Sequence, residues 1–329
     1  MPSRELPALH PAKHPAIAYL LVLALSLATL RIFHLIIEDW EVLARWQFDI
    51  LDGHAQYRAW QNRLLAPIIV YGLSLTGLSQ ASAFLVFVGG GLFVHNLILF
   101  GLLRRAWLAA DRAIWWLVLY CFGFLFLARQ FYLGSDVIDI IVFTILGHFM
   151  LAGNGTFHLT VLFLVAIANR ETGLFVALYM LIDSLGRDPD RGRWAFSVDK
   201  AGFAWAAVLM GLGMLFTKLA RDLLFVSTPS GGLDAGHATL GNHFYLFDNL
   251  RSVFWTNLNY PYILHTLFML LFLGTLIYTF RGLSERRQKA VVIIFAYFAS
   301  VMIFGLFNEL RMLLPFLSFA ILYYAIPRS

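Results

Sequence analysis

Long runs of apolar residues fill most of this 329-residue chain and limit what it can fold into. Hydrophobic residues make up 60% of the sequence and charged residues only 13%. An average soluble domain carries about 25% charged residues. A helix of about 20 apolar residues is long enough to cross a bilayer. We therefore predict an all-α, polytopic integral membrane protein in which residues 1–329 form a single membrane domain.

Eleven apolar runs are candidate helices, at 16–37, 64–79, 82–103, 113–128, 136–152, 157–168, 172–184, 201–217, 259–280, 290–307 and 310–327. The first run follows Arg4 and Lys13, is long enough to span, and has no small-x-small cleavage site after it. We expect it to be a signal anchor that stays in the protein.

The basic residues predict the orientation of these helices. They gather near the N-terminus and at 104–112, 187–200 and 281–289, and Lys and Arg favour the cytoplasmic side. All these clusters share one side if 64–79 lies at the outer interface and 157–184 forms two short helices that meet outside. We therefore expect about ten transmembrane helices plus an interfacial helix, in a bacterial inner membrane. Both termini would be cytoplasmic, and 38–79 and 218–258 would be outer loops.

Arg170 and Glu171 stand side by side within the apolar stretch 156–182. A charged side chain at the bilayer centre costs roughly 2.5–3.5 kcal/mol on insertion scales. The Asn, Thr and Gly residues at 169–173 favour a turn, which would place the two charges at the outer mouth of two short helices. The predicted topology brings four further charged residues to the same side: Asp136, Asp139, Glu309 and Arg311. Together they indicate one polar cavity at the outer interface.

Each of these charges also has a purely structural interpretation. Arg170 and Glu171 could form an ion pair that only holds two helices together. Asp136 follows Gly134 and Ser135 and could cap a helix. A glutamate at position 309 would suit the positive end of a helix dipole, which does not account for Arg311 two residues later.

The first outer loop combines two carboxylates, Asp49 and Asp52, with Tyr57, Arg58 and Arg63. Arginine suits phosphate because its planar guanidinium donates two parallel hydrogen bonds. The pattern indicates a catalytic carboxylate beside groups that bind a phosphate. The alternative is a solvated amphipathic loop with ordinary surface charges.

Metal and nucleic-acid sites have little support in the sequence. The segments 49–54 (DILDGH) and 234–243 could begin a metal site, but neither has a strong ligand spacing. We expect no cofactor, with a divalent metal as the alternative. Cys121 is the only cysteine, which excludes an intrachain disulfide, a cysteine zinc cluster and a redox pair. The pI of about 9.4 reflects basic membrane loops, so we expect no nucleic-acid partner.

The order of these motifs resembles the GT-C superfamily of multispanning membrane glycosyltransferases, in particular its small bacterial members. The acidic pair and Tyr57 precede RLLAP (63–67), then come NRETGLF (169–175) and ELR (309–311), which together cover most of the membrane core. The chain departs from many members because no extra-membrane domain follows these motifs. Its acidic pair is also spaced D-x-x-D, so the choice between the two aspartates is open. Asp52 is favoured, because Gly53 after it would let the chain turn closely around a substrate.

The resemblance implies transfer of a sugar from a polyprenyl-phosphate donor at the outer membrane face, with inversion at the anomeric carbon. It implies that Asp49 or Asp52 is the general base, and that Glu171 and Glu309 orient the arginines. The donor phosphate would then be bound by some of Arg63, Arg170 and Arg311. The other partners would be membrane lipids, and protein partners are left open.

Three other functions fit the same pattern. A surface-polysaccharide polymerase would also use lipid-linked glycans, joined through pyrophosphate. A transporter would place broken helices and charges at mid-membrane, often in internal repeats, and no convincing repeat is visible here. A non-catalytic lipid-binding membrane subunit could keep the same fold.

Overall fold

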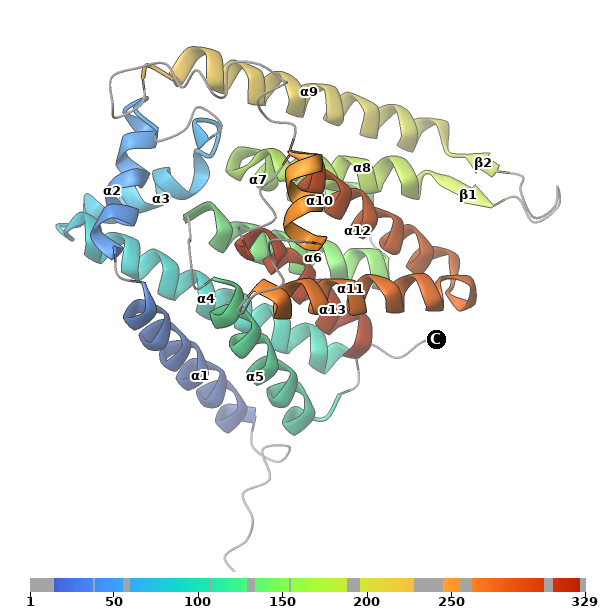
Figure 1. The fold of residues 1–329 in the computed structure, drawn as a ribbon, viewed down its shortest axis with the longest axis horizontal. Helices are drawn as coiled ribbons and strands as arrows, with labels where there is room; N and C mark the ends of the chain where they lie inside the picture. Colours follow the sequence, from blue (N-terminus) through green and yellow to red (C-terminus); the bar gives the residue numbers. More distant parts are fainter. Residues whose placement is uncertain are drawn as a thin grey trace, which may run out of the picture.

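The computed structural model of the chain is almost entirely helical (Figure 1). It describes residues 15–37, 39–55, 60–106, 108–128, 134–153, 155–187, 196–227, 245–254, 262–304 and 310–325.

Six helices in the described ranges are long and apolar enough to cross a membrane: α1 (Pro15–Ile36), α4 (Gln80–Arg105), α5 (Ala110–Leu127), α6 (Gly134–Ala152), α9 (Lys200–Leu224) and α12 (Glu285–Phe304). Other apolar helices stand beside them: α3 (Leu65–Ser74), α7 (Thr156–Asn169), α8 (Leu174–Asp183), α11 (Tyr262–Thr279) and α13 (Leu314–Ala325). This composition confirms an all-α polytopic architecture. The figure of ten crossings stays a prediction.

The centre of the bundle is formed by α4, α6 and α13, which pack against one another. Nearly every residue of α13 is buried, as are two thirds of the most apolar window of α6. Helix α9 lies at the periphery over α7 and α8 (Figure 1). Its outer face exposes large apolar side chains such as Phe203, Leu212 and Leu215, which suits contact with lipid.

The stretch 156–183 is two short helices, as the sequence predicted. Helix α7 ends at Asn169, a 3-10 turn covers Glu171–Gly173, and α8 begins at Leu174. Helix α9 shows that the pair is antiparallel. The beginning of α9 contacts the ends of α7 and α8 that are far from the turn at 169–173. Trp205 donates to Thr160 at 2.9 Å, and a Cβ on Gly202 would lie 3.6 Å from Ser184.

Gly173 makes this reversal possible. A Cβ at this position would lie 2.5 Å from the backbone nitrogen of Ile167, so no larger residue fits without moving the backbone. The chain therefore folds back onto the last turn of α7, and residues 169–173 lie at one end of the bundle. A helix of 14 residues is about 21 Å long, shorter than a hydrocarbon core of about 30 Å.

The opposite end of the bundle holds several basic residues. Arg286 at the start of α12 donates to the carbonyl of Ala152 at 3.0 Å, which joins it to the end of α6. Lys289 donates to the carbonyl of Asp183 at 3.0 Å, which joins α12 to the end of α8. The segments 134–139 and 169–173 are at the other ends of these helices, so the two groups of charges lie at opposite ends of the bundle.

Several segments differ from the sequence prediction. Residues 40–51 form a helix, α2 (Trp40–Leu51), where a loop was expected. Its buried residues lie at positions 40, 43, 44, 47 and 50, a helical spacing that gives one apolar face. Helix α3, which was expected to be interfacial, ends at Ser74, short of the expected 79, and at about 15 Å is too short to span.

Two further elements were not anticipated. An antiparallel pair of strands, β1 (Leu185–Arg187) and β2 (Phe196–Val198), lies between α8 and α9, and β2 falls within the basic region 187–200. In the region 218–258, expected to be an outer loop, α9 continues to Leu224 and α10 (Leu246–Phe254) packs on the end of α12. The remainder of that region, 228–244 and 255–258, lies outside the described residues.

The two-ended arrangement predicts how single cysteines will label in intact cells. In a Cys121→Ser background, Thr76→Cys should react with an impermeant maleimide added outside, and Leu108→Cys should not. Thr76 is exposed and Leu108 is partly buried against the core, so labelling of position 108 after permeabilisation is the control for its accessibility. Labelling of position 108 from outside, with none at position 76, would reverse the predicted orientation.

Candidate functional site

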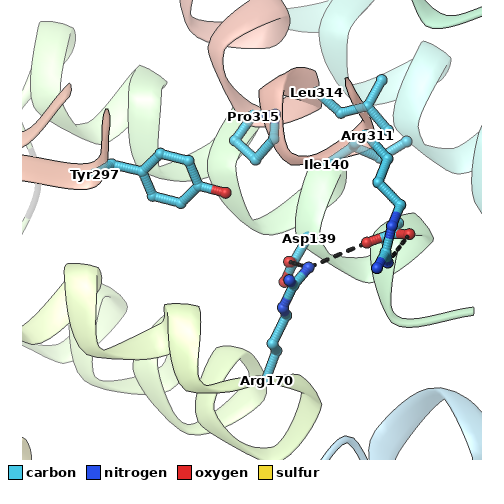
Figure 2. A pocket seen from close by; sticks show the side chains of 8 residues that line it. Asp139, Ile140, Arg170, Tyr297, Arg311, Leu314 and Pro315 are labelled. Atoms are coloured by element: carbon cyan, nitrogen blue, oxygen red, sulfur yellow. Dashed lines mark hydrogen bonds and ion pairs between the residues drawn. The ribbon is translucent and has the colours of Figure 1, made fainter. Parts of the chain in front are cut away.

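A buried cluster of charges lies where α6, the end of α7 and the start of α13 meet (Figure 2). We call this group, Asp136, Asp139, Arg170 and Arg311, the inner cluster. Asp136 and Asp139 are in the first two turns of α6, and both are buried. Arg170 directly follows α7, and Arg311 is in the 3-10 turn η8 (Leu310–Leu313) that precedes α13. Three segments far apart in the sequence therefore contribute charges to one place, as the sequence predicted.

The two aspartates hold both arginines by ion pairs. Nη1 of Arg170 lies 3.1 Å from Oδ1 of Asp136 and 3.2 Å from Oδ2 of Asp139. Nη1 of Arg311 lies 3.0 Å from Oδ2 of Asp136, which therefore bridges the two guanidinium groups. Charges buried in this way require partners, because removing one partner leaves the other uncompensated at a cost of several kcal/mol.

Neutral side chains complete the coordination of Asp139. Asn169 donates to its Oδ1 at 2.9 Å and also to the carbonyl of Ser135 at 2.9 Å. The hydroxyl of Thr172 lies 3.2 Å from the same oxygen. The polar residues that end α7 and turn the chain thus bind the carboxylate of α6, which ties the helix break to the charge cluster.

Glu171 takes part in a second, more accessible group. Its Oε2 accepts a hydrogen bond from Asn62 at 2.9 Å and lies 4.0 Å from Nη2 of Arg221 on α9. Its Oε1 lies 3.6 Å from Nη2 of Arg63. Arg170 and Glu171 therefore have different partners, as expected for adjacent residues that point in different directions.

Arg63 is buried without a full set of partners. It lies just before α3, only 4% exposed, and its guanidinium is 6.0 Å from the ring of Trp60. Among the described residues, its Nε and Nη1 have no hydrogen-bond partner. Burial and the nearby positive charge of Arg170 together lower the pKa of Arg63 to about 9, against the opposing effect of Glu171. The guanidinium is still protonated at neutral pH and lacks the close carboxylate that Arg170 and Arg311 have.

A small cavity adjoins the inner cluster. It has about 170 Å³ of unfilled volume, in gaps too narrow for a water molecule, and is lined by Asp136, Asp139, Ile140, Arg170, Tyr297, Arg311, Leu314 and Pro315. The ring of Tyr297 points toward the cluster (Figure 2), and its hydroxyl donates to the carbonyl of Met312 at 3.2 Å. A phosphate cannot reach Arg170 in this conformation unless an aspartate moves away.

Asp49 and Asp52 lie at the end of α2, apart from this cluster. Among the described residues, no hydrogen bond or ion pair joins either carboxylate to Arg63, Arg170 or Arg311. Asp49 is half-buried, and burial raises its pKa, with Arg45 opposing the change. Asp52 is exposed and ends the helix.

Gly53 has a different role from the one its sequence position suggested. We expected it to let the chain turn closely around a substrate. Its φ of +78° does form a tight turn, but a Cβ there would meet the carbonyl oxygen of Leu224 at 2.3 Å. Its own carbonyl accepts a hydrogen bond from the nitrogen of Val226 at 2.8 Å. The chain after α9 fills this space, which places the acidic end of α2 one turn of α9 from Arg221.

Several predicted site residues cannot be placed. Tyr57, Arg58 and Glu309 lie outside the described residues, as does the segment 234–243. In the part of the chain that is described, no group of three His, Cys, Asp or Glu side chains could hold a metal ion.

Sequence reasoning missed two polar residues of the site, Asn62 and Arg221. Asn62 is fully buried and precedes Arg63, so a polar Gln–Asn–Arg run before an apolar helix was the available signal. Arg221 lies in the last turn of α9, just after the apolar run 201–217, where a basic residue is ordinarily assigned to the membrane surface.

The inner cluster predicts a severe effect of removing Arg170. Arg170→Leu would leave Asp139 without an ion-pair partner and should destabilise the protein by about 3–5 kcal/mol. Adding Asp139→Asn should restore much of this loss, since Asp136 would keep Arg311. Adding Glu171→Leu to Arg170→Leu should restore nothing. Thermal unfolding of the purified protein in detergent measures all three, and equal stability of both double variants would contradict the pairing.

No family model, curated protein or solved structure matches the chain in the comparisons made with known proteins. The resemblance to GT-C glycosyltransferases therefore rests on the motifs quoted above.

Proposed function

We propose that this protein is a membrane glycosyltransferase. It moves a sugar from a polyprenyl-phosphate donor to an acceptor hydroxyl, with inversion at the anomeric carbon. The reaction takes place at the end of the bundle opposite the basic residues of α12. If those basic residues are cytoplasmic, this end of the bundle is at the outer face of a bacterial inner membrane.

The observation that carries the proposal is the gathering of Arg63, Arg170, Arg221 and Arg311 at one end of the bundle. Preorganised cations in a site of low dielectric constant stabilise a leaving group whose negative charge grows in the transition state. Peripheral helices with apolar outer faces would let a polyprenyl tail lie alongside. The phosphate of such a lipid would then lie near the arginines at this end of the bundle.

In the proposed reaction, α2 supplies the general base and the arginines act on the leaving group. A carboxylate of α2 takes the proton of the acceptor hydroxyl, whose oxygen then bonds to the anomeric carbon. The bond from that carbon to the phosphate oxygen breaks, and the phosphate leaves with the electron pair. Arg63 stabilises the departing charge, while the ion pairs of Arg170 and Arg311 keep the surrounding segments in place.

Asp49 is the better candidate for the base. A general base works best when its pKa lies near the working pH, and burial raises the pKa of Asp49. Asp52 is exposed, and the turn at Gly53 that favoured it contacts α9. Asp52 stays the second candidate, since both lie on the last turn of α2 or directly after it.

A lipid-binding membrane subunit without catalytic activity is the second candidate function. It is favoured by the absence of a direct contact between the described α2 carboxylates and the arginines. A polymerase acting on pyrophosphate-linked glycans would share the same arginines and differ in its donor.

Replacement of the base tests these functions. Asp49→Asn should reduce the release of polyprenyl phosphate from a panel of polyprenyl-phosphate sugars by about 10²–10⁴-fold. Asp52→Asn should have a smaller effect. The measurement uses purified protein in nanodiscs with a membrane extract as the source of acceptor.

Folding is the control for this experiment. Because burial raises the pKa of Asp49, its ionised form is less stable in the folded protein than in the unfolded chain. Its contribution to stability falls as the pH rises through that pKa. Asp49→Asn should therefore keep or raise the Tm at pH 7. Near-normal release by both variants would show that neither aspartate is the base, whereas no release by the wild-type protein would favour a non-catalytic subunit.

A further inference from the structure

The arginines at this end of the bundle differ in how well they are neutralised. Arg170 contacts two carboxylates at 3.1 and 3.2 Å, and Arg311 contacts one at 3.0 Å. Both ion pairs of Arg170 use Nη1, and its Nε has no hydrogen-bond partner among the described residues. Arg170 nevertheless differs from Arg63, because an anion that approached it would meet the negative charge of Asp136 and Asp139 within 3.2 Å.

Arg63 is in a different state. Its only ion pair among the described residues is with Glu171, at 3.6 Å, which is beyond hydrogen-bond distance. Two of its nitrogens are buried without a partner. A buried donor without an acceptor costs free energy, more so when it is charged. The guanidinium is therefore prepared for an acceptor that is absent from the described chain.

Glu171 is loosely held and reachable. Its side chain is 33% exposed, whereas that of Arg63 is 5% exposed. Its closest contact is the hydrogen bond from Asn62 at 2.9 Å, and Arg221 lies on the same oxygen at 4.0 Å. Asn62 and Arg221 are joined to each other, since Nε of Arg221 donates to Oδ1 of Asn62 at 3.2 Å. These two residues can keep the carboxylate when it moves away from Arg63.

We propose that Glu171 is a displaceable counter-ion, and that a phosphate-type anion binds by replacing it at Arg63. The unpartnered Nε and Nη1 then donate to the anion, and Asn62 and Arg221 retain the carboxylate at the rim. This inference rests on the proposed function only for the class of ligand, a phosphate monoester on a lipid. It assigns Arg170 and Arg311 to holding the site together, in place of binding the phosphate.

The arrangement makes Glu171 a competitor of the ligand. A carboxylate beside the guanidinium repels an incoming phosphate and must be moved before the phosphate can bind. Glu171→Gln removes that charge and keeps the shape and a hydrogen bond to Asn62. It should bind phosphate more tightly, by roughly tenfold, which corresponds to about 1.4 kcal/mol. A glutamate that merely orients Arg63 for the ligand predicts the opposite, weaker binding.

Titration calorimetry of the full-length protein in nanodiscs tests this directly. The probes are inorganic phosphate and geranyl phosphate, so that a free anion and a lipid headgroup are compared. Glu171→Gln should tighten the binding of either probe that binds the wild type. Arg63→Ala should lose it, and Arg63→Lys should weaken it, because an ammonium cannot present two nitrogens to one phosphate. Asp183→Asn is the matched control, since it removes a carboxylate paired with Lys289 at the opposite end of the bundle.

Each outcome has a defined meaning. Tighter binding by Glu171→Gln with unchanged binding by Asp183→Asn supports the proposal, even if Arg63→Ala does not fold. Weaker or unchanged binding by Glu171→Gln would overturn it, as would wild-type affinity in a folded Arg63→Ala protein. Binding of geranyl phosphate alone would identify a lipid headgroup as the ligand. The Asp49→Asn experiment measures sugar transfer, and this experiment measures anion binding. Failure of the proposed function can therefore be distinguished from failure of the present proposal.

Discussion

The burial of Arg170 is the constraint on which the rest of the structure depends. A guanidinium inside an apolar bundle is stable only when carboxylates and hydrogen bonds accompany it. Asp136 and Asp139 supply them from the start of α6, and Asn169 and Thr172 fix Asp139 from the two sides of the helix break. The break therefore does more than shorten two helices. It brings the polar turn at 169–173 to the end of the bundle, where the other charged segments can reach it.

The same arrangement separates the charges into two groups with different properties. The inner group is closely paired and leaves no room for a ligand. The outer group contains an under-paired arginine, a partly exposed glutamate and two polar residues contributed by α9 and the segment before α3. The closely paired inner group can hold the outer group in position, and the outer group leaves an arginine able to bind an anion at the membrane surface. Asp49 lies on the last turn of α2, and the turn after this helix is joined to the chain after α9 by a hydrogen bond from Val226 to Gly53.

Much of this was predictable from the sequence, because membrane helices follow directly from apolar runs. The turn at 169–173 was predicted from its Asn, Thr and Gly residues, and its meeting with Asp136, Asp139 and Arg311 from the distribution of basic loops. The pairing was not predictable. Which carboxylate meets Arg170 depends on helix rotation and depth, and neither is contained in hydropathy. The helical spacing of Trp40, Leu43, Gln47 and Ile50 would have predicted helix α2. The segment was instead interpreted as a loop because it contains many polar residues.

The most direct measurement is an electron cryo-microscopy structure of the wild-type protein in nanodiscs with a polyprenyl phosphate bound. The account predicts phosphate oxygens within hydrogen-bond distance of Nε and Nη1 of Arg63. Glu171 should have turned toward Asn62 and Arg221, and Arg170 should still contact Asp136 and Asp139. A phosphate bound to Arg170 with those ion pairs broken, or bound at the basic end of the bundle, would contradict it.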